Sequence, residues 1–223
     1  MDWHDAAMAT AESRQLGLVG AAGLLLFLIG SFVPGVAPPV DAPTGDWSLY
    51  LTENRAVILL GAVMTVTAVP LMLAVVAAAT STRRTPSGAY ALAAWVFAFG
   101  FIVLAEGLMA AVAWQGPDTL DESTLRFAVD AAHLALWGLS AGPAAVAVVV
   151  TTVVARRDGL APRWLMALAA IKVLTSVVEL AGVGVTHGWN AGGYAAFSSG
   201  VALAAWLAGL IWVTLRHDPA TRA

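Results

Sequence analysis

Residues 89–114 read AYALAAWVFAFGFIVLAEGLMAAVAW, and this stretch decides the fold. Its 26 residues include one charged side chain, Glu106, and no proline. A helix needs about 20 apolar residues to cross a bilayer whose hydrocarbon core is about 30 Å thick. The stretch is longer than this requirement, so it predicts a membrane-spanning helix.

The rest of the chain repeats the same pattern. Proline-rich, glycine-rich or charged segments separate long apolar stretches, and none shows the alternation of a β-barrel strand. Helices satisfy their own backbone hydrogen bonds in lipid. We therefore expect an all-α polytopic membrane protein, with residues 1–223 forming a single domain, a bundle of six transmembrane helices. The predicted spans are about 16–36, 56–79, 89–114, 127–155, 163–186 and 192–215.

Composition excludes several other classes of protein. Of the 223 residues 60% are hydrophobic and 11% are charged, where about 25% charged residues is usual for soluble domains. The chain has no cysteine, which excludes disulfides and thiolate metal sites. A net charge of −3 gives no support for nucleic-acid binding. The N-terminal segment has no leading basic cluster, so we expect no cleaved signal peptide and a first span that is retained.

The placement of arginine predicts the orientation. One side of the membrane receives eight arginines, whereas the other receives Arg55 and Arg126 among six acidic residues. The positive-inside rule then places both termini in the cytoplasm. The alanine- and arginine-rich composition indicates a bacterial inner membrane, with an actinobacterium as the source. Homo-oligomers and a partner membrane subunit are left open. The eight arginines are Arg14, Arg83, Arg84, Arg156, Arg157, Arg163, Arg216 and Arg222.

The loop of about 37–55 is the longest. Its segment 45–55, GDWSLYLTENR, predicts a short interfacial helix. We expect Asp46 to cap this helix and Trp47 and Tyr50 to lie at the headgroup level.

Prolines and glycines inside the spans predict local features of the helices. Pro70 and Pro143 are expected to kink their helices because proline lacks a backbone N–H. Gly138, Gly142 and Gly182 resemble small-residue contacts that let helices approach closely.

Five ionisable residues fall inside the predicted spans: Glu106, Asp130, His133, Lys172 and Glu179. Such groups are costly in lipid, so they usually face the bundle interior and find partners. At 1.5 Å per residue, the acids and the histidine lie about 5–12 Å below the outer boundary, and Lys172 about 21 Å below it. We therefore expect three helices to deliver polar groups to one layer.

Helical spacing predicts which side chains share a face, since residues at i, i+3, i+4 and i+7 lie on one side. Two stripes are expected to face the bundle interior, toward Glu106. Arg55 and Arg126 are expected at the outer mouth, where they can pair with Glu53, Asp130 or an anionic ligand. The stripes are Lys172, Thr175, Ser176 and Glu179 on the fifth span, and Asp130, His133 and Trp137 on the fourth.

These residues predict a polar outer-leaflet pocket formed by the third, fourth and fifth spans. Three carboxylates face one lysine and one histidine, so we expect one carboxylate to be protonated or hydrated. The leading hypothesis is that the pocket binds or converts a lipid-like or isoprenoid-like molecule by carboxylic acid/base chemistry. Whether the protein is an enzyme of the cyclase, isomerase or hydrolase kind is left open. The catalytic candidates are Glu106, Asp130, His133 and Glu179, and the binding candidates are Lys172, Trp137, Ser176, Thr175, Arg126 and Arg55.

Two alternatives remain beside this hypothesis. The buried charges can be structural salt bridges, with Lys172 paired to Glu106 or Glu179 and His133 paired to Asp130. The protein is then an accessory membrane subunit, or it is a small proton- or ion-coupled carrier. No HExxH or comparable spacing is present, so no metal is predicted, and no cofactor is expected.

Residues 125–171, LRFAVDAAHLALWGLSAGPAAVAVVVTTVVARRDGLAPRWLMALAAI, carry a family resemblance. The stretch resembles a broad family of uncharacterised six-span bacterial membrane proteins, a domain of unknown function. His133 and Pro162 match the family pattern, whereas Lys172 and Glu179 are not part of it. In size and layout the chain is also similar to small membrane-bound terpene cyclases, without any of their motifs. The resemblance implies a fold and no particular reaction.

Overall fold

The computed structural model describes residues 3–80, 86–182 and 194–216. Within these ranges the chain is helical and contains no strand. Because α5, η2 and α6 follow one another without a break, they form one long helix. The described elements are α1 (Trp3–Phe32), α2 (Thr44–Glu53), α3 (Arg55–Thr80), α4 (Pro86–Gln115), the 3-10 turn η1 (Pro117–Thr119), α5 (Glu122–His133), the π-helical segment η2 (Leu134–Leu139), α6 (Ala141–Arg157), α7 (Arg163–Gly182) and α8 (Tyr194–Arg216).

Six helices in the described ranges are long and apolar enough to cross a membrane. They run over Arg14–Phe32, Arg55–Thr80, Pro86–Gln115, Glu122–Arg157, Arg163–Gly182 and Phe197–Arg216. The prediction of an all-α chain with six spans is therefore confirmed. The predicted ends at 183–186 and 192–193, and Arg83, Arg84 and Arg222, lie outside the described residues. The cytoplasmic placement of the termini remains a prediction.

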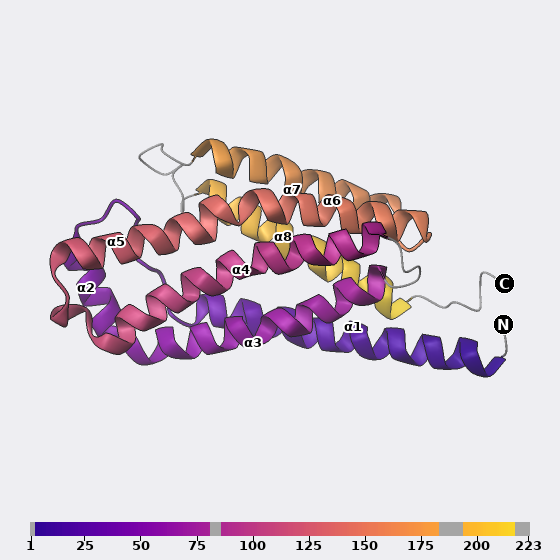
Figure 1. Cartoon of the computed structure of the whole chain (residues 1–223), viewed down its shortest axis with the longest axis horizontal. Helices are drawn as coiled ribbons and strands as arrows, with labels where there is room; N and C mark the ends of the chain where they lie inside the picture. The colour runs from indigo at the N-terminus through magenta and orange to yellow at the C-terminus, as the bar shows by residue number, and fades with distance from the viewer. Residues whose placement is uncertain (1–2, 81–85, 183–193, 217–223) are drawn as a thin grey trace.

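The long helices form an elongated bundle. The start of α1 and the end of α8 lie at one end, which we call the termini end, and α2 and the start of α5 lie at the other, the α2 end (Figure 1). Helix α1 packs along α3 and also contacts α8, α4 packs between α3 and α6, and α7 packs against α6 and α8.

Side-chain exposure fits a lipid environment. Large apolar side chains such as Phe97 (63% exposed) and Leu174 (65%) point outward, as expected where the surrounding medium is hydrocarbon. The centre of the bundle is closed by aromatic rings. Trp95 stacks on Phe99 and on Trp206, with centroid distances of 5.2 and 5.6 Å.

Close helix contacts come mainly from glycines of α1. A Cβ added at Gly23 would lie 2.7 Å from the Cβ of Leu71 on α3, and one added at Gly20 would lie 2.7 Å from that of Val75. The prediction of a close contact at Gly142 is wrong, because nothing lies within 4 Å of a Cβ added there. Gly20, Gly23 and Gly30 of α1 face α3, a neighbour that the sequence did not identify.

The fourth span contains a π-helical segment just before Pro143. The backbone N–H of Ser140 donates to the carbonyl of Ala135, five residues back, at 3.2 Å. Proline removes one helical donor and crowds the carbonyl four residues before it. The disturbance expected at Pro143 therefore takes the form of a widened turn on its N-terminal side.

The helix predicted in the 37–55 loop exists as α2, but the prediction of its cap was wrong. The residue before its first turn is Pro43, with no capping side chain, and Asp46 lies inside that turn. Trp47 is buried inside the protein, 1% exposed. The reason is that α2 folds back against α5, so the indole packs inside the α2 end.

Candidate functional site

The most completely buried charges lie between α7 and α8. Lys172 and Glu179 are each 3% exposed, and Ser199 of α8 is 1% exposed. The ammonium of Lys172 donates a hydrogen bond to the Ser199 hydroxyl, which in turn bonds to the Glu179 carboxylate. The lysine is also attracted electrostatically to Glu179. Ser199 thus bridges a lysine and a glutamate that stand two helical turns apart on α7.

Ser176 lies on the same face of α7, between the two charges. It is 1% exposed, and its hydroxyl has no hydrogen-bond partner among the described residues. Its neighbour Thr175 is half-buried and donates to the backbone carbonyl of Lys172 at 3.0 Å. A buried hydroxyl without a partner costs about 1–3 kcal/mol, which makes it an unusual feature beside two charges. We call Lys172, Ser176, Glu179 and Ser199 the α7–α8 cluster.

A layer of aromatic rings lies on the termini side of this cluster. Trp206 follows Ser199 by seven residues on α8, which corresponds to about 10 Å along the helix. Its indole N–H donates to Thr152 at 3.1 Å, and Trp95 donates to Thr151 at 2.9 Å. These side chains are fully buried or nearly so. The cluster is therefore closed toward the termini end by packed, hydrogen-bonded rings.

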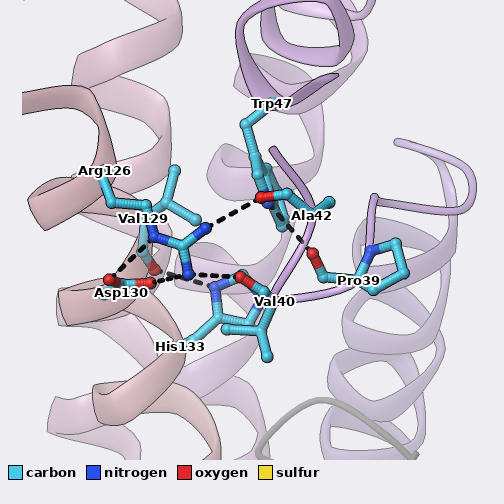
Figure 2. Close-up of polar contacts among 8 residues, drawn as sticks. All are labelled: Pro39, Val40, Ala42, Trp47, Arg126, Val129, Asp130 and His133. Carbon is cyan, nitrogen blue, oxygen red and sulfur yellow. Dashed lines mark hydrogen bonds and ion pairs between the residues drawn. The ribbon is translucent and has the colours of Figure 1, made fainter. Parts of the chain in front are cut away.

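A second polar group ties the loop before α2 onto α5 (Figure 2). Arg126 forms an ion pair with Asp130 at 2.8 Å. The nitrogen in that ion pair, Nη2, also donates to the carbonyl of Val40 at 2.6 Å, and Nη1 donates to the carbonyl of Ala42 at 2.9 Å. The Asp130 side chain is 49% exposed, so the prediction that it faces inward was wrong. Its partner stands one turn away on the same helix, at the rim of the bundle.

His133 lies below this ion pair (Figure 2). Its Nδ1 is 2.8 Å from the carbonyl of Val129, and its ring meets Trp47 edge-on at a centroid distance of 5.1 Å. Trp47 is in turn held by a bond from its indole N–H to the carbonyl of Pro39 at 3.2 Å. The histidine therefore packs against the folded loop as part of a structural joint.

Glu106 of α4 is half-buried near Tyr50 of α2. The phenol of Tyr50 donates to the carbonyl of Pro34 at 3.1 Å. Burial and the nearby Glu106 charge raise the pKa of Tyr50 above its ordinary value. Trp137, another predicted pocket residue, lies in η2 and is half-buried.

The candidates therefore fall into separate groups. In the described parts of the chain, no hydrogen bond or ion pair joins Glu106, His133 and Glu179 to one another. Lys172 and Glu179 are linked through Ser199 without a direct ion pair, and Asp130 pairs with Arg126. No three His, Asp or Glu side chains among the described residues are grouped so that they could hold a metal ion.

A shallow hollow of about 750 Å³ lies between α3 and α4 near the α2 end. This is not the place where the sequence predicted a pocket. Arg55 stands beside the hollow, and its guanidinium donates to the carbonyl of Trp114 at 2.5 Å. Arg55 thus borders a hollow other than the pocket at whose mouth it was predicted.

Sequence reasoning missed Ser199 and the role of Trp47. Ser199 belongs to the segment FSSG near the start of the last span. A serine there has no charge to mark it, and nothing in the sequence tells which helix packs beside α7. The signal that could have found it is the spacing of Lys172 and Glu179, which are too far apart along one helix to meet directly.

Comparison of the chain with protein-family models, with curated proteins and with solved structures found no match. The six long apolar helices agree with the six-span layout of the resemblance noted above, and no family is identified.

Proposed function

We propose that the protein is a membrane-embedded binder of a neutral amphiphilic molecule, whose polar group is held by the α7–α8 cluster. The observation that carries this proposal is the unpartnered hydroxyl of Ser176 beside a buried lysine and a buried glutamate that Ser199 bridges. A charged residue at the centre of a membrane helix costs about 2.5–3.5 kcal/mol on insertion scales. Such groups usually mark functional sites, and an unpaired hydroxyl between them provides a place for a ligand to bind.

The charges of the cluster indicate the chemistry of the ligand. Lys172 and Glu179 neutralise each other through Ser199. A ligand with a net charge would leave one buried charge without a partner, which is strongly unfavourable. A hydroxyl group can both donate and accept hydrogen bonds, and it satisfies Ser176 without disturbing the pair. We therefore favour an alcohol-type headgroup on a lipid-like or isoprenoid-like body.

The surroundings favour an apolar body for this ligand. The opposite side of α7 presents Leu174 (65% exposed), Val177 (58%) and Leu180 (45%) to the lipid. A molecule that reaches the cluster between α7 and α8 from the membrane must itself dissolve in the acyl region. The α7–α8 cluster is thus a site for an amphiphile rather than for a free ion.

Binding is better supported than the other hypotheses. The aromatic layer of Trp95 and Trp206 closes the cluster toward the termini end, which argues against a continuous proton path. Acid/base catalysis by a set of converging carboxylates has little support, because Asp130 and Glu179 are each held by a separate cation. The alternative hypothesis to be tested is an accessory subunit whose buried charges have a purely structural role.

The test is to purify the protein in mild detergent, extract bound molecules with solvent and quantify them by mass spectrometry. We expect the wild type to carry close to one neutral, hydroxyl-bearing amphiphile per chain. Ser176→Ala should lose most of it, because that hydroxyl makes no contact within the protein. Ser140→Ala is the matched control, since Ser140 is also buried but bonds to the carbonyl of Leu136 in its own helix.

If the cluster has a purely structural role, the expected results are different. If nothing binds, removing an unpaired buried hydroxyl should leave stability unchanged or raise it by about 1–3 kcal/mol. A wild type without a bound amphiphile, together with a stabilised Ser176→Ala variant, would refute the binding function.

A further inference from the structure

The hollow between α3 and α4 is separate from the α7–α8 cluster, because different residues form it. It is shallow and open to its surroundings, with a volume of about 750 Å³. Its wall is made largely of small side chains on α4, whose Gly107 and Ala111 are exposed. The lining residues are Leu59, Gly107, Ala110, Ala111, Trp114 and Gln115.

Arg55 stands at the mouth of this hollow. It is the first residue of α3, one helical turn before Leu59. Its guanidinium lies 5.9 Å from the centroid of the Trp114 ring and donates one hydrogen bond, to the carbonyl of that tryptophan. Arginine carries five N–H donors. In the described part of the chain no carboxylate forms an ion pair with Arg55, so its charge is available to an anion.

We propose that this hollow is a binding site for one anionic phospholipid, with an acyl chain along α4 and the phosphate on Arg55. The residues from Gln115 to Gly107 cover about 12 Å of helix, enough for the upper part of an acyl chain. The exposed Trp114 ring is 69% accessible and lies at the helix end, where tryptophans meet the headgroup region. An arginine guanidinium binds phosphate through two parallel hydrogen bonds.

Charge favours a lipid over a second copy of this chain. In a two-fold symmetric contact each surface meets its own counterpart. A contact with its two-fold axis at the hollow would bring two Arg55 side chains close together, and like charges at close range are unfavourable. A zwitterionic lipid fits the hollow equally well but gains less from the guanidinium. The site therefore predicts a preference for headgroup charge, which can be measured.

The first test compares phosphatidylglycerol with phosphatidylcholine of identical acyl chains, titrated onto delipidated protein and followed by native mass spectrometry. We expect the wild type to bind phosphatidylglycerol several-fold more tightly. Arg55→Gln should remove this preference. Arg216→Gln is the matched control, because its guanidinium also lies over a tryptophan, 3.8 Å from the Trp212 centroid, but without the hollow.

The second test fills the hollow. A Cβ added at Gly107 meets nothing within 4 Å, so Gly107→Leu should fold and displace one bound lipid of either type. Gly100→Leu, on the same helix and equally open, should retain it. The proposal is wrong if the wild type shows no charge preference, or if Arg216→Gln matches Arg55→Gln. It is also wrong if Gly107→Leu changes the oligomeric state instead of the lipid count.

Discussion

Replacement of Gly23 by alanine should destabilise the bundle, because α1 and α3 touch there through their backbones. The added Cβ would lie 2.7 Å from the Cβ of Leu71, 2.9 Å from the backbone nitrogen of Met72 and 3.1 Å from the carbonyl carbon of Leu71. A rotamer change cannot relieve contacts with backbone atoms. The helices must therefore separate until the closest distance reaches at least 3.4 Å, a shift of about 0.7 Å.

The size of the effect follows from two opposing terms. A gap of 0.5–1 Å forfeits about a quarter to a half of the dispersion energy of each affected atom pair, and overpacking typically costs about 1–3 kcal/mol. Alanine is the better helix former by about 1 kcal/mol, which offsets part of that cost. We expect Gly23→Ala to lose about 0–2 kcal/mol net of stability relative to the wild type, and more relative to a glycine-to-alanine change without a clash.

The control is Gly100→Ala, because a Cβ at Gly100 meets nothing within 4 Å. This variant keeps the gain in helix propensity without the clash, so it should be as stable as the wild type or slightly more stable. The assay is unfolding in mixed micelles with increasing denaturing detergent, followed by circular dichroism. If Gly23→Ala unfolds no earlier than Gly100→Ala, the close α1–α3 contact is not a source of stability.

Three further predictions concern the polar contacts. Asp121→Ala should fray the first turn of α5, seen as faster amide exchange there. Hydrogen bonds from its neighbours hold the pKa of Asp121 below its ordinary value, so its stabilising effect is present at neutral pH and is lost as the pH falls through that lowered value. Arg126→Gln should speed limited proteolysis of the loop before α2, whereas Asp130→Asn should do so less, because the bonds from the arginine to the loop carbonyls remain. Thr152→Val should cost about 1–3 kcal/mol by leaving the Trp206 N–H unpaired. Trp206→Phe should therefore cost less in the Thr152→Val background than in the wild type; additive losses in detergent unfolding would contradict this.

The six spans could be predicted from the sequence because membrane insertion depends on length and hydropathy, which are properties of each segment alone. The inward stripe on the fifth span could also be predicted. Lys172, Ser176 and Glu179 are all buried, as helical spacing requires. The same rule failed at Asp130, since a residue near the end of a span can turn to a partner at the rim, and Arg126 one turn away provides one.

The neighbours of each helix could not be predicted. The spacing of polar residues along α7 indicates which face of the helix is polar, but not which helix covers that face. We expected α4 and α5 to meet this stripe, whereas Ser199 of α8 does so. In lipid the apolar faces of all six helices are nearly equivalent, so packing is decided by small contacts such as the glycines of α1. Those contacts depend on shape over several turns, which hydropathy does not record.

The spacing of Lys172 and Glu179 explains why a third residue is needed. Residues three or four apart on a helix can meet directly, but a separation of seven residues corresponds to about 10 Å of rise. A buried ion pair over that distance requires a polar group from outside the helix. The Ser199 hydroxyl fills this position and also sets the height of α8 against α7. Ser176 lies between the same two charges and is left without a partner. A purely structural role, fixing the height of α8 against α7, explains why Ser199 is present. It does not explain the unpartnered Ser176 hydroxyl, so we favour a binding site over a purely structural contact.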